Sequence, residues 1–350
     1  MIAKILRRHA VAWAMAVAPA HAATTEAPPA APPKPLKLRV AHMQDETHPW
    51  HKAFERFRDV LGAKAEAHIE AEIFPAGKLG VERDYVSYLR QGVLDVATIT
   101  PNGLAPMAPE VTFLDLLFLW RDRVHWRRAF DGDVGQAVTK LIRAGSTRGG
   151  EPGVEVLGYW GGSDVHILSR SRGYRTVEDF AGAKVRVQDS ALQIEMWTAL
   201  GARPISLPFD LVPAALEDGR IDAVLVSTPT ALAQKLYERA PHLSRVGLAI
   251  NARAMVMSGQ TWARLDARQR EAVAAAARAA TDLDRELEAE QSDVAVERLA
   301  ALGVKVYAFE ARALMRERLA AIQRRTARDL GLTDLLSTIE NEWAPPRPSP

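Results

Sequence analysis

The feature that most limits the fold of this chain is a run of about 36 residues, from Ala267 to Leu302, without glycine or proline. Asp266 precedes the run as a helix N-cap residue, and Gly303 follows it as a stop signal. As one continuous helix the run would extend roughly 54 Å, which exceeds the size of a small domain. Two interpretations therefore stay open: one helix that could brace two domains, or two helices broken near Ser292.

Before this run, the sequence alternates between strand and helix patterns. The first series predicts a strand at residues 36–43, a helix at 50–61, a strand at 68–74, a helix at 81–89 and a strand at 93–100. This order is typical of an α/β domain with a mostly parallel sheet.

A glycine-rich break at residues 145–153 precedes a second series. It predicts strands at 154–160, 165–169, 183–188 and 221–227, and helices at 190–200 and 210–218. At 350 residues the chain has room for two domains, so the predicted fold class is α/β with two such units.

The composition excludes several functional classes. The net charge is only +2, and no basic stripe is interleaved with aromatic residues, which argues against nucleic-acid binding. The sequence has no cysteine, which excludes disulfides, thiolate metal sites and a cysteine nucleophile.

The N-terminus has the pattern of a secretory signal peptide. A basic segment at residues 4–8 is followed by a short apolar stretch at 10–18 and by a small-residue triplet at 20–22 that suits signal peptidase. We therefore predict a signal peptide at residues 1–22, export to the periplasm, and a proline- and alanine-rich tether at 23–35. The alternative is an amphipathic N-terminal helix of a cytosolic protein.

The sequence carries no catalytic motif of the common kinds: no GxGxxG after a strand, no P-loop, no HExxH and no GxSxG. His48 and His51 have the spacing of half a metal site, but no third or fourth ligand is evident. Pro49 between them favours an N-terminal helix turn instead. We therefore expect neither an enzyme nor a bound cofactor or metal.

One predicted strand carries a sharper signal. Its two valines share one face, and its polar residues share the other: Lys184, Arg186 and Gln188. An arginine in the middle of a buried strand is costly unless it meets an anion, and its planar fork matches a carboxylate. A ligand or a protein carboxylate would both satisfy it, so the spacing leaves both open.

Further motifs follow one another in a fixed order along almost the whole chain, at residues 74–80, 91–95, 118–122, 176–187, 199–204, 207–209 and 215–222. Together they closely resemble the substrate-binding proteins of TRAP transporters, the DctP-like family. The resemblance implies two α/β lobes joined by hinge strands, with a long helix contacting both lobes and closure over a small organic acid. The implied partners are a small and a large integral membrane subunit that import the solute.

On this basis we predict lobe 1 at residues 36–162, completed by about 251–285, and lobe 2 at 163–250, completed by about 286–340. Two other functions share the architecture and stay open as alternatives. One is a ligand sensor, and the other is the binding protein of an ATP-driven importer, although the latter class lacks the Arg186 motif.

The resemblance also implies a set of ligand-binding residues. In the family, the arginine corresponding to Arg186 forms a two-pronged salt bridge with the ligand carboxylate, and an aromatic residue lies at the position of Phe209. Gln188 shares the strand face of Arg186. The weaker candidates, all small polar residues near strand ends or the expected hinge, are Thr100, Asn102, Ser227, Thr228 and Asn251.

This chain departs from the family pattern at His166, where many carboxylate binders carry a second basic residue. A histidine titrates near 6.5 unless its environment shifts it. If His166 faces the cleft, we expect a ligand carboxylate to be bound more tightly as the pH falls from about 8 to about 6. The alternative is that His166 points into the lobe or to solvent.

We expect the mature protein to begin near Ala23, because the triplet at residues 20–22 ends the apolar stretch at the distance that signal peptidase requires. N-terminal sequencing of exported protein checks this. Exported protein that still begins with Met1 would contradict it.

Overall fold

The computed structural model describes residues 35–150 and 153–341, so the expected signal peptide and most of the tether lie outside the described residues. Within the described part, nine strands form one sheet in the order β2-β1-β3-β8-β4-β7-β5-β6, with β9 paired to β8. The strands are β1 (Leu36–Ala41), β2 (Ile69–Phe74), β3 (Val96–Ile99), β4 (Val154–Ser169), β5 (Lys184–Val187), β6 (Arg203–Ser206), β7 (Ala223–Ser227), β8 (His242–Ser258) and β9 (Lys305–Ala308).

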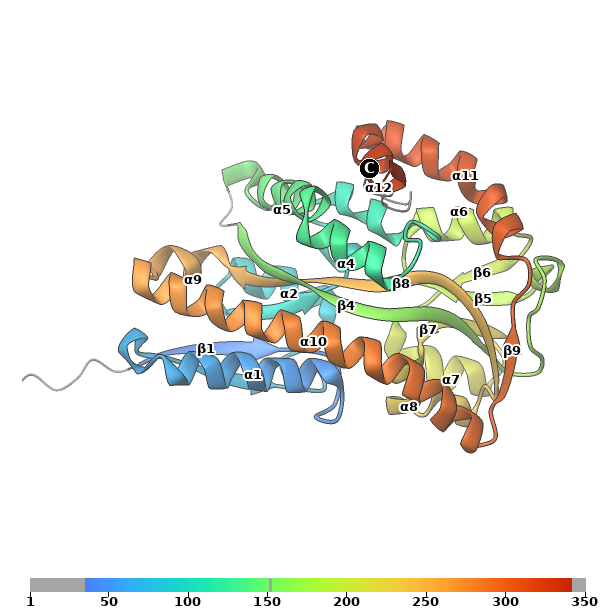
Figure 1. Ribbon diagram of the computed structural model, residues 1–350, viewed down its shortest axis with the longest axis horizontal. Coiled ribbons are helices and arrows are strands. Elements are labelled where there is room, and N and C mark those ends of the chain that lie inside the picture. Colours follow the sequence, from blue (N-terminus) through green and yellow to red (C-terminus); the bar gives the residue numbers. More distant parts are fainter. Residues whose placement is uncertain (1–34, 151–152, 342–350) are drawn as a thin grey trace, which may run out of the picture. The chain divides into compact units, whose positions relative to one another are not determined.

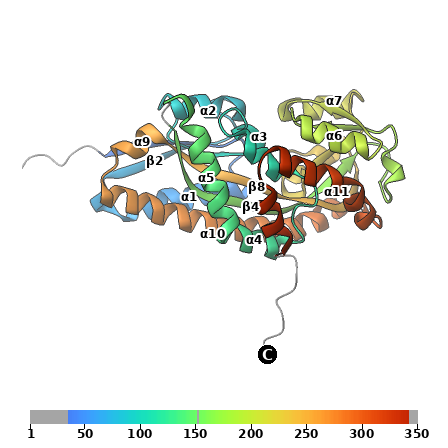
Figure 2. The ribbon, with the colours of Figure 1, turned by 90° about the horizontal axis from the view of Figure 1, so that it is seen from above.

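Helices lie on both faces of this sheet (Figures 1 and 2). They are α1 (Pro49–Ala63), α2 (Glu82–Arg90), α3 (Pro101–Leu104), α4 (Arg123–Asp131), α5 (Asp133–Ser146), α6 (Ala191–Ala199), α7 (Val212–Glu217), α8 (Thr228–Ala233), α9 (Gly259–Arg264), α10 (Ala267–Ala301), α11 (Arg312–Asp329) and α12 (Thr333–Asn341). None of the helices in the described ranges is long and apolar enough to cross a lipid bilayer.

Two long strands join the two halves of the sheet. β8 pairs with β3 at residues 254–257, whereas β4 pairs with β7 at residues 165–169. Between these points the β4–β8 ladder has a register shift between Gly161 and Asp164. This irregularity lies next to the lobe boundary expected after residue 162, and the extents of the two lobes stay a prediction.

Each half contains a parallel set of strands, as the strand–helix order predicted. β1 is parallel to β2 and β3, and β5 is parallel to β6 and β7. β4 and β8 are antiparallel to each other and to the strand sets that they border. The two lobes are therefore two parallel units connected by an antiparallel pair.

Helix α10 is one continuous helix, so the interpretation as two helices is excluded. In a capping box, the side chains of Asp266 and Gln269 accept hydrogen bonds from each other's backbone N–H groups at the start of the helix. It packs against α1 along its first half and against α8 further on, as Figure 1 shows. Its buried residues are alanines and a valine in the first half and Ala295 and Leu299 near its end. Between them lies a buried polar group: Thr281, Asp284, Arg285, Glu288 and Ser292.

Glycines of β4 let α10 approach the sheet at this polar stretch. A Cβ added to Gly158 would lie 2.4 Å from the Oγ1 of Thr281. Gly161 and Gly162 have φ angles of 128° and 127°, a region that only glycine occupies readily. A Cβ on Gly161 would also lie 1.9 Å from the carbonyl oxygen of Asn251 in β8. The bulge therefore requires glycine for conformation and for space.

Two predicted elements need correction. The strands expected at 154–160 and 165–169 form the single strand β4, because the two glycines between them make a bulge instead of a turn. The helix expected at 210–218 begins with a separate 3-10 turn (Phe209–Leu211) before α7.

Replacing Gly161 with alanine should lower the free energy of unfolding by at least about 3 kcal/mol, because the added Cβ collides with a backbone oxygen and opposes the positive φ. Urea unfolding at pH 7 measures this loss. Gly182→Ala is the matched control, since Gly182 has a φ of 69° but nothing within 4 Å of an added Cβ. Its loss should stay at about 1–2 kcal/mol; equal losses would contradict the steric argument.

Candidate functional site

Arg186 and His166 share one face of the sheet near the carboxyl ends of β5 and β7. Arg186 pairs with Val224 of β7, and His166 pairs with Val226 two residues further along the same strand. Residues two apart on a strand point to the same face. Because open α/β sheets bind ligands beyond the carboxyl ends of their parallel strands, this edge of lobe 2 is the candidate site.

Arg186 is the buried cation of this site. It is 7% exposed, its Nε donates to the carbonyl oxygen of Leu207 at 2.9 Å, and its guanidinium carbon lies 5.6 Å from the ring centre of Phe209. Burial lowers the pKa of Arg186 to about 10, with Asp210 opposing the shift from a distance. The guanidinium is therefore charged at neutral pH, yet no described carboxylate forms an ion pair with it.

Two neighbours complete this part of the site. The Oε1 atom of Gln188 is buried and has no hydrogen-bond partner among the described residues. It is an acceptor, suited to a hydroxyl group of a ligand. Phe209 is partly buried and packs against the core between the sheet and α7 and α8. Arg186, Gln188 and Phe209 together offer a charge, an acceptor and an apolar wall.

His166 is 6% exposed, and its Nδ1 accepts a hydrogen bond from the backbone N–H of Gly247 at 3.1 Å. Burial lowers the pKa of His166 to about 4; nearby arginines add to this effect and Asp164 opposes it. The expectation that this histidine titrates between pH 8 and 6 is therefore wrong, because the ring is neutral throughout that range. With Nδ1 as acceptor, the neutral ring carries its proton on Nε2 and can donate one hydrogen bond.

The hydroxyls of Ser227 and Thr228 are used inside the protein. Ser227 donates to the Oγ1 of Thr230 at 3.0 Å, and Thr228 donates to the carbonyl oxygen of Ser292 in α10 at 2.7 Å. Thr228 is fully buried and ties the start of α8 to the long helix. Its hydroxyl therefore serves the packing of α8.

The remaining candidates belong to the other half of the sheet. Thr100 caps α3, and its N–H and hydroxyl both donate to the carboxylate of Glu82. Asn102 lies within α3, and Asn251 lies in β8 beside the bulge. The structure records no contact between Arg186 and these three residues, so their place in the binding site stays a prediction.

Two polar contacts were not predicted from the sequence: those of the buried arginine Arg253, and a hydrogen bond between two glutamines. Arg253 in β8 is buried, lies 3.6 Å from the ring centre of Trp50, and has its Nη1 3.6 Å from a carboxylate oxygen of Glu82. Gln44, after β1, accepts a hydrogen bond from Gln234, after α8, at 3.2 Å. For Arg253, the available signal was a lone arginine in the apolar segment 252–257. The hydrogen bond between Gln44 and Gln234 joins residues far apart in the chain and has no local sequence pattern.

His48 and His51, the two histidines with the spacing of half a metal site, have different partners. The Nδ1 of His48 accepts a hydrogen bond from the backbone N–H of Trp50 at 3.2 Å and so caps α1, as the N-terminal-turn interpretation predicted. His51 instead contacts His42, with Nδ1 and Nε2 3.1 Å apart. The described residues contain no group of three or more potential metal ligands.

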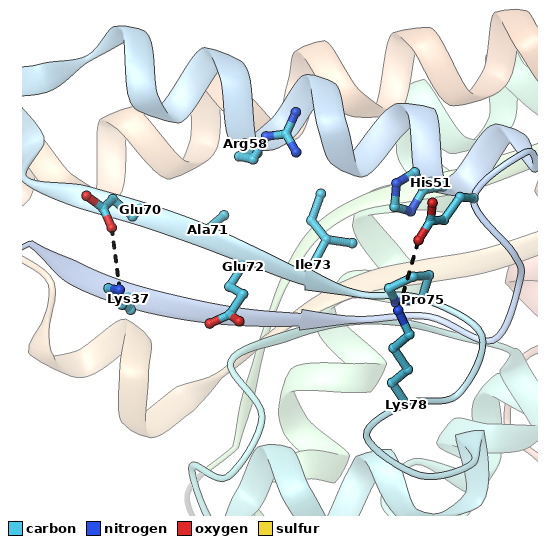
Figure 3. A pocket seen from close by; sticks show the side chains of 10 residues that line it. Lys37, His51, Arg58, Glu70, Ala71, Glu72, Ile73, Pro75 and Lys78 are labelled. Carbon is cyan, nitrogen blue, oxygen red and sulfur yellow. Dashed lines mark ion pairs between the residues drawn. The ribbon is translucent and has the colours of Figure 1, made fainter.

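A pocket of about 390 Å³ lies at the other end of the sheet, between α1 and β2 (Figure 3). Its lining is charged, and the charges pair with one another: Lys37 with Glu70 and Lys78 with Glu46, each at 4.0 Å. It holds no buried unpaired cation comparable to Arg186. The candidate anion-binding group is therefore Arg186 of β5 and not a residue of this pocket.

Comparison with known proteins identifies the family of the chain. Residues 40–329 match the family model described as bacterial extracellular solute-binding protein, family 7, or DctP. A solute-binding protein of Sulfitobacter sp. (strain NAS-14.1) is 31% identical over 305 residues, which cover 86% of this chain and 90% of that protein. The 2,3-diketo-L-gulonate-binding periplasmic protein of Escherichia coli (strain K12) is 26% identical, covering 77% of this chain and 80% of its own length.

A solved structure gives the same result for the fold. A TRAP periplasmic solute-binding protein from Sulfitobacter sp. NAS-14.1, with bound α-D-taluronate, superimposes with a TM-score of 0.81 at 30% identity. The match covers 87% of this chain and 97% of that chain. The expected two-lobed α/β fold is thereby confirmed.

The low pKa of His166 has a measurable consequence for stability. The unfolded chain binds this proton near pH 6.5 and the folded protein only near 4, so stability is lost as the pH falls through that window. Between pH 7 and 5, wild type should lose about 2 kcal/mol more than His166→Gln in urea unfolding. His68→Asn, at an exposed histidine, is the control and should behave as wild type. The assignment would be refuted if His166→Gln lost more stability between pH 7 and 5 than His68→Asn.

Proposed function

The chain belongs to family 7 of the bacterial extracellular solute-binding proteins, and on that premise we propose that it captures a sugar acid and delivers it to the membrane subunits of a TRAP transporter. The observation that carries the proposal is the buried guanidinium of Arg186, which is charged and has no carboxylate partner among the described residues. A bound carboxylate would supply that partner in two parallel hydrogen bonds.

The relatives narrow the chemical class. The Sulfitobacter structure holds a uronate, and the Escherichia coli protein is named for a diketo-gulonate. A TRAP periplasmic solute-binding protein from Pseudomonas putida F1, 25% identical with a TM-score of 0.81, holds D-glucuronate. These ligands share one carboxylate and a chain of oxygen substituents. We therefore propose a monocarboxylic sugar acid of six carbons as the ligand.

In the proposed site, each residue contacts a different part of the sugar acid. Arg186 binds the carboxylate, and Phe209 packs against the carbon skeleton. The Oε1 of Gln188 accepts a hydrogen bond from a hydroxyl, and the Nε2–H of neutral His166 donates one. A neutral donor in place of a second cation suits a ligand with one carboxylate and many hydroxyls.

Localisation and partners follow from the same family membership. We propose export through the N-terminal signal peptide, residence in the periplasm, and docking to a small and a large integral membrane subunit. The family description as extracellular supports the compartment. Co-purification of this protein with those subunits in the presence of the sugar acid tests the partnership.

Arg186→Ala should weaken binding of D-glucuronate or D-galacturonate by roughly 30-fold to several thousand-fold, because the ligand loses one partner of a buried charge pair. Isothermal titration calorimetry with the purified mature chain measures the affinity, and thermal unfolding checks that the variant is folded. D-Glucose, which lacks the carboxylate, should bind neither protein.

The matched control is Arg203→Ala, at an exposed arginine of the neighbouring strand β6. It should bind with wild-type affinity. A folded Arg186→Ala protein that retains wild-type affinity for every sugar acid bound by wild type would overturn the site.

A further inference from the structure

Two acidic side chains in the middle of α10 are completely buried. Asp284 and Glu288 are both 0% exposed, and they stand four residues apart, so they are neighbours on one face of the helix. This face packs against the bulge of β4 where the two halves of the sheet meet. The site is separate from the proposed ligand-binding residues, and the inference does not rest on the proposed function.

Each carboxyl group has one oxygen with a partner and one without. The backbone N–H of Gly161 donates to the Oδ2 of Asp284 at 2.8 Å, and the indole N–H of Trp50 donates to the Oε1 of Glu288 at 2.9 Å. The Oδ1 of Asp284 and the Oε2 of Glu288 are buried and have no partner among the described residues. A buried acceptor without a donor is destabilising, so the unpaired oxygens need an explanation.

Three arginines lie near the pair, and none of them forms an ion pair with Asp284 or Glu288, although the buried Nε and Nη1 of Arg253 have no hydrogen-bond partner among the described residues. Arg253 forms its ion pair with Glu82, and Arg285 forms its ion pair with Asp131 while its Nε donates to a backbone carbonyl. Arg123, the third cation near the pair, is bound to two aspartates. With both groups ionised, two adjacent negative charges would be buried beside Arg253, whose single charge is shared with Glu82.

One bound proton would pair the two free oxygens and would also remove one of the two buried negative charges. If one carboxyl group is protonated, its O–H donates to the unpaired oxygen of the other, and the pair carries a single negative charge. We propose that Asp284 and Glu288 share one proton at neutral pH, and that this acid pair fixes the Gly161–Gly162 bulge of β4 to α10. Through the indole of Trp50, the same pair connects the long helix to α1 of lobe 1.

The electrostatic environment supports the shared proton. Burial raises the pKa of Glu288 to about 7. It raises that of Asp284 well above its usual value, and the neighbouring carboxylate adds to this effect. Arg253 opposes both shifts, and Arg123 also opposes that of Glu288. His48 also lies near Arg253, but burial holds its pKa well below 6.5, so it is neutral and cannot replace a cation.

The pair therefore makes the attachment of the β4 bulge to α10 sensitive to pH. An acid whose pKa is raised on folding stabilises the folded protein less as the pH rises from its unfolded to its folded pKa. For Glu288 this window extends from about 4.5 to about 7. Across that window the stabilisation from the protonated carboxyl group is progressively lost as the pH rises.

Asp284→Asn tests the proposal, because asparagine imitates the protonated acid. Its carbonyl can accept from Gly161, and its amide can donate to the free oxygen of Glu288. The ratio of the unfolding equilibrium constants, wild type over variant, should rise on the order of 100-fold from pH 5 to pH 8. Taking the ratio cancels the contribution of the histidines. Glu288→Gln should behave alike and replaces Asp284→Asn if that variant does not fold.

The matched control is Asp282→Asn, on the exposed face of the same helix, where the aspartate side chain is 72% exposed. Its ratio to wild type should not change with pH. The proposal is overturned if the Asp284→Asn and Glu288→Gln ratios are also constant between pH 5 and 8.

Infrared spectroscopy at pH 7 in deuterated buffer gives an independent measurement. The wild-type spectrum should contain the carbonyl band of a protonated carboxylic acid that is missing from Asp284→Asn and from Glu288→Gln. Asp115, another buried acid, whose pKa burial raises to about 7, contributes equally to all three spectra and cancels in the difference. An absent difference band would show that both carboxyl groups are ionised and would refute the shared proton.

Discussion

The close approach of α10 to the bulge of β4 is the contact on which the two halves of the molecule depend. It requires glycine at Gly158 and Gly161, since a Cβ at either position would meet the helix or the neighbouring strand. It also requires polar side chains on the helix, because the bulge leaves a backbone N–H without a ladder partner and Asp284 accepts it. An apolar seam at this point would leave that group unsatisfied, which explains why a helix lined with alanine on its first half turns polar in its middle.

The candidate site depends on the burial of one charged side chain. Arg186 sits on a strand whose other face is part of the core, so its position is set by the sheet and its charge cannot move to solvent. Burial weakens the charged form without removing it, as the pKa of about 10 indicates. The protein thereby keeps a desolvated cation, whose hydrogen bonds to an anion are stronger than those of an exposed arginine. His166 at the neighbouring position is a neutral donor, so the proposed site contains a single positive charge for a ligand carboxylate.

The sequence predicted the parts of this structure that depend on local patterns. The alternation in strands β1, β2 and β5 and the uninterrupted run of α10 marked those elements, and the family motifs marked Arg186 as a candidate. The long strand β8 was not predicted, because it is buried on both faces where it carries Arg253 and shows no clean alternation. The hydrogen bonds of Thr228 and the pairing of Gln44 with Gln234 join residues far apart in the chain, so no periodicity reveals them. The low pKa of His166 depends on burial by such contacts and was missed for the same reason.

The order of the strands leaves β2 and β6 with one unpaired edge each. An open edge is a template on which the strand of another molecule can add, and this is a common route to aggregation. On β2 the exposed Glu70 and Glu72 place charges on the edge strand, and Lys37 of β1 pairs with Glu70 (Figure 3). On β6, Pro204 has no N–H to offer and Arg203 adds a cation. Charge on β2 and a proline in β6 therefore oppose the pairing of another molecule's strand at these two edges.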